Sequence, residues 1–259
     1  MKLYKYAKCS DYLINSLTNR TFWLAAPYKF NDCREGDFRF IEEDPSTIVK
    51  IFNENPIFKT KLHWLYDDLF KCYSTEKSFN DIVLGRYEIY RSLFGLTSFS
   101  EENDNSLMWA HYADESRGVC VEYEVDVDNV NLFPVTYTNT LPSLSTSDII
   151  FDSKNSMIKV LTTKSIDWSY EREWRLVHEE IDQFRNEKEG GLVSIPFKIT
   201  CIIFGHRIDN TLLEKFQCIL DDLKTSVCFA SPSKFTYAMD IIDLKSSLIE
   251  PRWKYILKI

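Results

Sequence analysis

The alternation of apolar and polar residues predicts a chain built mainly of β-strands, with helices at a few defined positions. Gly118–Val125 carries an apolar residue at every second position, as a strand does, and Lys2–Tyr6 also alternates. Asp11–Asn19 and Asn210–Leu223 instead carry apolar residues at helical spacing. Further strands are expected at Thr21–Ala26, Leu93–Ser100, Val135–Tyr137, Glu171–His178, Leu192–Phe197, Ile199–Phe204, Val227–Ala230 and Phe235–Leu244.

Helical spacing of apolar residues also runs through residues 45–91, which interrupt the series of strands. We therefore expect a helical insertion there, within a single domain that spans residues 1–259. A short helix is expected after Asn105-Ser106, because either side chain can cap its first turn. A loop followed by a helix is expected over Ser143–Thr163. The predicted class is α+β, with a mostly antiparallel, split or two-layer sheet and flanking helices.

The composition of the 259 residues narrows the possible functions. A formal net charge of −8 argues against general nucleic-acid binding, because phosphate contacts dominate that affinity. With only 7 glycines, the chain has neither of the common glycine-rich phosphate-binding motifs. The 4 histidines and 7 cysteines are scattered without metal-ligand spacing, so no metal site is expected. We find no secretory signal and no membrane-spanning run, and expect a cytoplasmic location with reduced cysteines and no membrane contact.

The most unusual stretch of the sequence is Tyr170–Arg175, which combines two acids, two bases and two aromatic side chains. On a strand, Glu171, Glu173 and Arg175 would share one face. Two carboxylates about 7 Å apart on such a face can split into an ionised and a protonated partner, or both can stay ionised beside the Arg. The alternative interpretation is a solvated charged face beside a strand anchored by Trp174.

Six short strings occur in a fixed order along the chain. They are Leu3-Tyr4-Lys5-Tyr6, Phe30-Asn31-Asp32, Ser98-Phe99-Ser100, Met108-Trp109-Ala110-His111-Tyr112, Arg117-Gly118-Val119-Cys120 and Tyr170–Arg175. Together they resemble a bacterial family named domain of unknown function 2971. The family usually reads F-N-D-P-x-E, whereas this chain has Cys33 in place of the Pro and keeps Glu35. Because Pro would fix φ, this loop is expected to be less rigid here.

More distantly, the order of strands, helices and acids resembles the ADP-ribosyltransferase superfamily. The resemblance implies an ADP-ribosyltransferase-like fold with NAD as the substrate. Lys5 stands where that superfamily has Arg or His, and Ser98 and Ser100 would orient NAD through their hydroxyls. Glu171 and Glu173 would be catalytic, one stabilising the oxocarbenium-like ribose and the other acting as a base. The further residues assigned to NAD binding on this resemblance are Tyr6, Asn31, Asp32, Trp109, His111, Tyr112 and Arg175.

Structural roles are an open alternative for most of these residues. Lys5 is also explained as a surface residue at a strand end, and Ser98–Ser100 as caps of the polar turn that follows. Trp109 and Tyr112 lie three residues apart on the short helix, which suits core packing. Asn31-Asp32 is equally well explained as a turn lock or as a ligand loop.

Three functions are compatible with the sequence. The first is an ADP-ribosyltransferase-like enzyme that modifies a protein or a nucleic acid, in the context of a toxin or an anti-phage defence effector with a neutralising antitoxin-type partner. It predicts that Lys5, Ser98 and one of the two acids line a single cleft. The second is a non-catalytic sensor or partner-binding protein. The third is a magnesium-dependent nuclease, whose carboxylates would be Asp32, Glu35, Glu171 and Glu173.

Overall fold

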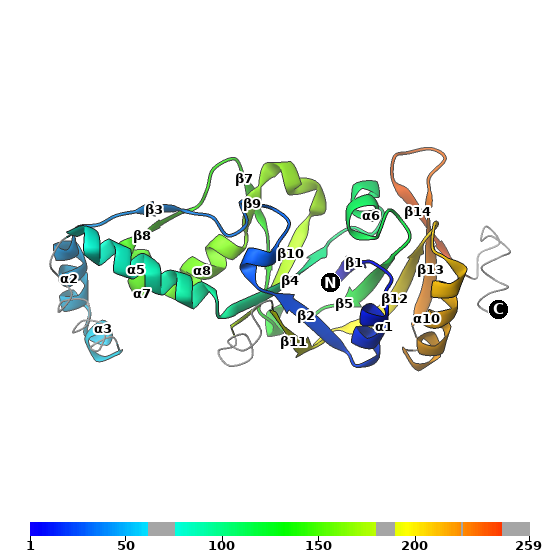
Figure 1. Ribbon diagram of the computed structural model, residues 1–259, viewed down its shortest axis with the longest axis horizontal. Coiled ribbons are helices and arrows are strands. Elements are labelled where there is room, and N and C mark those ends of the chain that lie inside the picture. Colours follow the sequence, from blue (N-terminus) through cyan, green and yellow to red (C-terminus); the bar gives the residue numbers. More distant parts are fainter. Residues whose placement is uncertain (62–75, 180–189, 224, 245–259) are drawn as a thin grey trace.

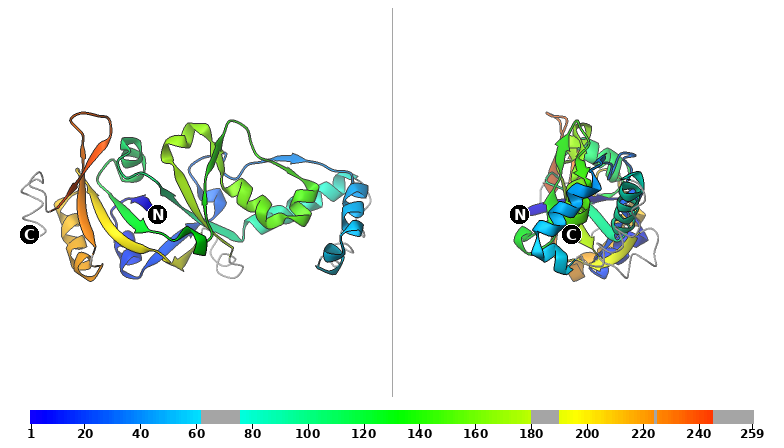
Figure 2. Two further views of the ribbon diagram at one scale, coloured as in Figure 1. Left: turned by 180° about the vertical axis from the view of Figure 1, so that it is seen from behind. Right: turned by 90° about the vertical axis from the view of Figure 1, so that its left-hand side faces the viewer.

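The structure of the protein is a computed structural model that describes residues 1–61, 76–179, 190–223 and 225–244. Figures 1 and 2 show an elongated molecule, with a broad β-sheet toward one end and a group of helices at the other. Among the described residues, we find no helix with the length and apolar character needed to cross a membrane.

One open sheet of ten strands dominates the described part of the chain. Its strands are β1 (Lys2–Ala7), β2 (Thr21–Ala25), β4 (Phe94–Ser100), β5 (Val119–Glu124), β6 (Leu132–Pro134), β10 (Glu173–Glu179), β11 (Gly190–Ser194), β12 (Lys198–Gly205), β13 (Ser226–Pro232) and β14 (Met239–Asp243). The main order is β11-β2-β4-β1-β5-β12-β13-β14; β10 branches from β4 and pairs in turn with β6. Within this sheet only β12 and β13 pair in parallel.

Different helices cover the two faces of this sheet (Figure 1). Helices α1 (Asp11–Thr18) and α10 (Asn210–Leu223) bury Leu17 and Phe216 in a core that includes Val121. Helix α6 (Ser106–Tyr112) packs on a second core, where Trp109 lies near Cys120. Cys120 and Val121 are successive residues of β5, so the alternation of side chains along the strand separates these two cores.

The remaining helices form a third core at the other end of the molecule. They are α2 (Pro45–Glu54), α3 (Pro56–Lys61), α5 (Glu76–Arg91), α7 (Thr146–Phe151) and α8 (Ser153–Leu161). Ile48 and Phe79 pack there with Met157 and Leu161. The helices of residues 45–91 therefore share a core with a later part of the chain; residues 62–75 of the expected insertion lie outside the described residues.

Two small parallel sheets and three short 3₁₀ helices complete the described structure. β3 (Arg39–Ile41) pairs with β8 (Ser143–Ser145), and β7 (Thr136–Thr138) pairs with β9 (Thr163–Ser165). The 3₁₀ helices are η1 (Pro27–Lys29), η2 (Val127–Asn129) and η3 (Ile166–Glu171). β9 and η3 lead directly into β10, and so bring their charged side chains to the start of that strand.

The predicted α+β class with a mostly antiparallel sheet is confirmed, and α10 has its predicted bounds. The strand expected from Glu171 begins at Glu173 instead, because Arg172 takes a left-handed conformation (φ 44°) at the end of η3. We also expect the strand at Val135–Tyr137 to continue the main sheet, and this is wrong, because β7 pairs with β9 in a separate sheet of the described structure. The loop and helix expected over Ser143–Thr163 are a short strand and two helices.

Candidate functional site

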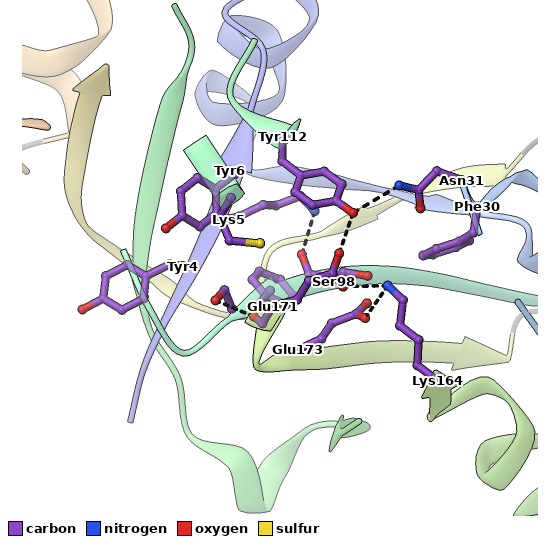
Figure 3. A pocket seen from close by; sticks show the side chains of 13 residues that line it. Tyr4, Lys5, Tyr6, Phe30, Asn31, Ser98, Tyr112, Lys164, Glu171 and Glu173 are labelled. Atoms are coloured by element: carbon purple, nitrogen blue, oxygen red, sulfur yellow. Dashed lines mark hydrogen bonds and ion pairs between the residues drawn. The ribbon is translucent and has the colours of Figure 1, made fainter. Parts of the chain in front are cut away.

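A pocket with a volume of about 130 Å³ lies between β1 and β4 (Figure 3). Its walls come from β1, β4, α6, β9, η3, β10 and the loop after η1. The lining residues are Tyr4, Lys5, Tyr6, Phe30, Asn31, Ser98, Phe99, Ser100, Met108, Tyr112, Lys164, Glu171 and Glu173. Lys5, Ser98 and the two acids, which are far apart in the sequence, therefore line one pocket.

The pocket exists because β1 and β4 diverge within the sheet. They pair only at Tyr4 and Ser100. In contrast, β1 pairs with β5 along its whole length, and β4 pairs with β10 from Ser100 to Phe94. Side chains of β1 and β4 beyond their single contact thus face a gap in the sheet, which Tyr112 of α6 and the Asn31 loop border (Figure 3).

Lys5 carries a positive charge on the β1 side of the pocket without a carboxylate partner. Its Nζ donates to the Thr97 hydroxyl at 2.6 Å and to the Ser98 carbonyl at 3.0 Å. No described carboxylate lies within ion-pair distance of it, and the nearest ring, that of Phe99, has its centroid 5.3 Å from Nζ. Burial lowers the pKa of Lys5 to about 8, although the charge of Glu173 acts in the opposite direction. Lys5 can therefore lose its proton near neutral pH.

The two serines of β4 play different parts. Ser100 donates to the Glu171 carbonyl at 2.7 Å and accepts from the Glu102 N–H at 3.1 Å, so it fastens β4 to η3. Ser98 Oγ is buried and makes no hydrogen bond of ordinary geometry among the described residues, but its hydroxyl is close enough to Glu173 to help lower the pKa of that carboxyl. Because buried hydroxyls are normally bonded, the Ser98 hydroxyl can donate either to Glu173 or to a ligand in the pocket.

Glu171 reaches the pocket from the end of η3. Its carboxylate accepts from the Tyr112 hydroxyl at 2.5 Å and from Lys164 Nζ at 2.6 Å. Asn31 Nδ2 donates to the same Tyr112 hydroxyl at 3.1 Å and so orients it (Figure 3). Burial raises the pKa of Glu171, and Lys164 and Tyr112 oppose that rise only in part. Glu171 is therefore a stronger base than an exposed carboxylate.

Glu173, the first residue of β10, is held on both carboxylate oxygens. Arg175 forms a bidentate pair with it, with Nε 2.8 Å from Oε1 and Nη2 3.0 Å from Oε2. Lys164 Nζ lies 3.2 Å from Oε2. Burial opposes ionisation of Glu173, but Arg175 and Lys164 hold its pKa at about 2. Glu173 is thus an anion well below the pH at which an exposed glutamate takes up a proton.

Arg175 extends this arrangement to Glu35, to which its Nη1 donates. We call Glu35, Lys164, Glu171, Glu173 and Arg175 the buried ion cluster, since the exposed fractions of their side chains lie between 0% and 4%. Burial alone would lower the pKa of Lys164, but the two carboxylates that it joins raise it. Arg175 pairs with Glu173 on its own strand, and the pKa values of the two acids move in opposite directions.

Four of the residues assigned to NAD binding lie outside this pocket. Trp109 is fully buried under α6, where its indole N–H donates to a backbone carbonyl at 2.8 Å. His111 is exposed on α6, and Arg175 is enclosed in the buried ion cluster. Asp32 accepts from the backbone N–H of Arg34 at 2.9 Å, as a turn lock does. Tyr6, which does line the pocket, donates its hydroxyl to a backbone carbonyl at 2.9 Å.

Lys164 is the central residue that sequence reasoning missed. It lies on β9, a strand of only three residues that no periodic pattern marks. The two acids and two bases of Tyr170–Arg175 balance each other in charge, so the sequence does not indicate that a further basic residue lies near them. Four other lining residues stand inside the motif strings and could have been found there, namely Tyr4, Phe30, Phe99 and Met108.

A family model described as "Protein of unknown function (DUF2971)" matches residues 108–176. The matched segment contributes Tyr112, Lys164 and both acids to the pocket. No curated protein and no solved structure matches the chain. Over residues 108–176, the chain is therefore similar to the family of proteins of unknown function DUF2971, as its motifs predicted.

Proposed function

We propose that the protein cleaves NAD between nicotinamide and ribose and transfers ADP-ribose to a protein or nucleic-acid target. The observation that carries the proposal is the convergence of Lys5, Ser98 and Glu171 in one pocket. These are positions to which the resemblance to ADP-ribosyltransferases gives roles in NAD binding and catalysis. The divergence of β1 and β4 around the pocket also suits an ADP-ribosyltransferase-like fold.

The size of the pocket limits which part of NAD enters it. A volume of about 130 Å³ is well below the roughly 300–1,000 Å³ that enclose a whole drug-sized ligand. We therefore place only the nicotinamide and its ribose inside, with the rest of the molecule across the open mouth. Ser98 Oγ, which makes no hydrogen bond of ordinary geometry, and Lys5, whose Nζ donates only to neutral oxygens, provide polar contacts that such a ligand can complete.

The two acids have separate roles in this proposal. As the bond from ribose C1′ to the nicotinamide nitrogen breaks, its electron pair leaves with nicotinamide and positive charge develops on the ribose. The fixed anion of Glu173 stabilises that charge electrostatically. A hydroxyl or amine of the target then forms a bond to C1′, and its proton passes to Glu171. Tyr112 and Lys164 hold the Glu171 carboxylate in position for this step.

Transfer of label from NAD carrying a radioactive adenine tests the proposal and identifies the target class. Incubation with a bacterial extract should attach label to a macromolecule, and protease or nuclease treatment then distinguishes protein from nucleic acid. Glu171→Gln should lower the transfer rate by roughly 10²–10⁴-fold, the usual contribution of a positioned base. Glu115→Gln, which alters an exposed acid paired with Arg117, is the matched control and should leave the rate unchanged.

A non-catalytic sensor or binding protein is the second candidate. The observation that favours it is the closure of the buried ion cluster, in which both acids already have partners within the protein. It predicts no nicotinamide release but a ligand-dependent rise in melting temperature. The nuclease hypothesis has less support, because no group of three His, Cys, Asp or Glu in the described part of the chain is arranged to hold a metal ion.

A further inference from the structure

A second pocket, with a volume of about 210 Å³, shares Lys164 with the first. Its walls come from the segments Asp32–Asp37, Thr138–Pro142 and Thr163–Ser165. The proposed chemistry of NAD cleavage uses none of the side chains of the first two segments. The pocket is smaller than a nucleotide site and has the scale of a single side chain or a small ion.

Glu35, which lines this pocket, has one carboxylate oxygen without a partner among the described residues. Arg175 donates to Oε1, whereas Oε2 is buried and has no hydrogen-bond partner among the described residues. The Glu35 side chain is only 2% exposed, so bulk water does not solvate that oxygen. A buried carboxylate oxygen without a hydrogen bond destabilises the fold, so we expect a donor from outside the described residues to bind it.

The charges around Glu35 favour a cationic donor. Asp32, Glu35 and Asp37 line the pocket together with two basic residues, Arg34 and Lys164. Arg34 Nε is paired with Asp37 Oδ2 at 3.1 Å. Lys164 Nζ is bound to the two acids of the first pocket, at 2.6 Å and 3.2 Å. Both bases are therefore paired with other acids. No described base pairs with Asp32, and Glu35 shares the single guanidinium of Arg175 with Glu173.

We propose that this second pocket binds a guanidinium group, which donates to Glu35 Oε2 and to Asp32. A guanidinium carries five donors in a plane and is weakly hydrated, so it suits several acceptors in a partly enclosed site. The hydroxyls of Thr138 and Thr140, which lie 3.3 Å apart, offer further acceptors at the rim. A metal ion is disfavoured, since the described residues provide no group of three ligands arranged for one.

Titration of the full chain with methylguanidinium, followed by two-dimensional NMR and calorimetry, tests the proposal. Binding should saturate, and the largest changes in NMR chemical shift should occur in the segments Asp32–Asp37, Thr138–Pro142 and Thr163–Ser165. N-methylurea has nearly the same shape but no charge, and it should bind far more weakly. Glu35→Gln should weaken methylguanidinium binding by about 10–100-fold, the usual value of a charged hydrogen bond. The exposed-acid variant Glu115→Gln should bind as the natural protein does.

Because Glu35 also pairs with Arg175, Glu35→Gln could fail to fold, so Asp32→Asn provides a second test. Asp32 is bonded only to a backbone N–H among the described contacts, and its variant should fold normally and bind methylguanidinium about tenfold more weakly. Absence of saturable binding, equal binding of N-methylurea, or unchanged affinity in folded Asp32→Asn overturns the proposal. An ordered water would then be the partner of Glu35 Oε2.

A third arm of the titration distinguishes two sources of the guanidinium. If a Gly-Arg-Gly peptide binds as tightly as methylguanidinium, the site takes an arginine side chain of a protein. If the peptide is excluded while methylguanidinium still binds, the site takes a free small guanidine. Both results support the proposal, and neither depends on NAD cleavage.

Discussion

The two walls of the first pocket hold their charges in opposite ways. On the β10 side, Arg175 and Lys164 bind both oxygens of Glu173. On the β1 side, Lys5 donates only to neutral oxygens, and Ser98 Oγ of the neighbouring β4 makes no hydrogen bond of ordinary geometry among the described residues. The β10 wall is complete by itself and sets the geometry of the pocket. The β1 wall lacks an acid that pairs with Lys5, so a bound ligand adds more new polar contacts on this wall than on the β10 wall.

The largest effect is expected from opening the β10 wall with Arg175→Met. The substitution leaves Glu173 and Glu35 buried without their guanidinium partner, and loss of one partner from a buried ion pair costs about 3–5 kcal/mol. Urea unfolding should show this loss of stability. Arg172→Met is the control, because Arg172 pairs with Glu102 at an exposed site and should contribute less than about 1 kcal/mol. Equal losses in the two variants would mean that the cluster does not hold the wall together.

A somewhat smaller effect is expected from acid. The pKa of Glu173 is about 2 in the folded protein, below its ordinary value of 4.5. Its ionisation therefore stabilises the fold above pH 4.5, by on the order of 3 kcal/mol, and this contribution is lost as the pH falls toward 2. The free energy of unfolding, measured by urea at a series of pH values, should fall over that window. A flat profile between pH 4.5 and pH 2 would contradict the assignment of Glu173 as a fixed anion.

The β1 wall should titrate where the β10 wall does not. Because burial lowers the pKa of Lys5 to about 8, its Cε resonance should titrate near that pH in an NMR experiment. Lys2 on the same strand is an internal control, because its hydrogen bond to Glu122 raises its pKa. The unfolded chain holds a Lys proton up to about pH 10.4, so Lys5 makes the folded protein gain stability as the pH rises from 8. If the Cε resonances of Lys5 and Lys2 titrated at the same pH, the proposed contrast between the two walls would be wrong.

The smallest stability effect is expected where the two walls meet, at Tyr112. Tyr112→Phe removes the hydroxyl that joins Asn31 to Glu171, at a cost of about 1 kcal/mol. If Glu171 is the base, the variant should also lower the rate of NAD cleavage, because the carboxylate loses a contact that orients it. A change in stability alone, with full activity, would assign Tyr112 to structure only.

Periodic elements of the fold could be predicted from the sequence, whereas short ones could not. Asn210–Leu223 repeats apolar residues over four turns, and the helix has those bounds. The three-residue strands β7, β8 and β9 are too short to carry a period, and only their partners define them. The left-handed Arg172 was also hidden, because nothing in its side chain favours that conformation over a continuous strand.

The candidate site was predictable in part for a related reason. Lys5, Ser98 and the two acids were identified from motif strings and their order, and they line one pocket. Trp109 belongs to the same strings but fills the core, since a string does not tell which side of a helix faces the pocket. Lys164 lies outside every string, and only the three-dimensional pairing of β7 with β9 brings it to the acids.

The rate of nicotinamide release from NAD, measured against pH for the natural protein and for Glu171→Gln, tests the central claim most directly. The account predicts release that increases with pH as Glu171 loses its proton, at a pH above the ordinary value for a carboxylate. It also predicts a loss of roughly 10²–10⁴-fold in a folded Glu171→Gln protein. No release in the presence of any target extract, or full activity of folded Glu171→Gln, would contradict the account.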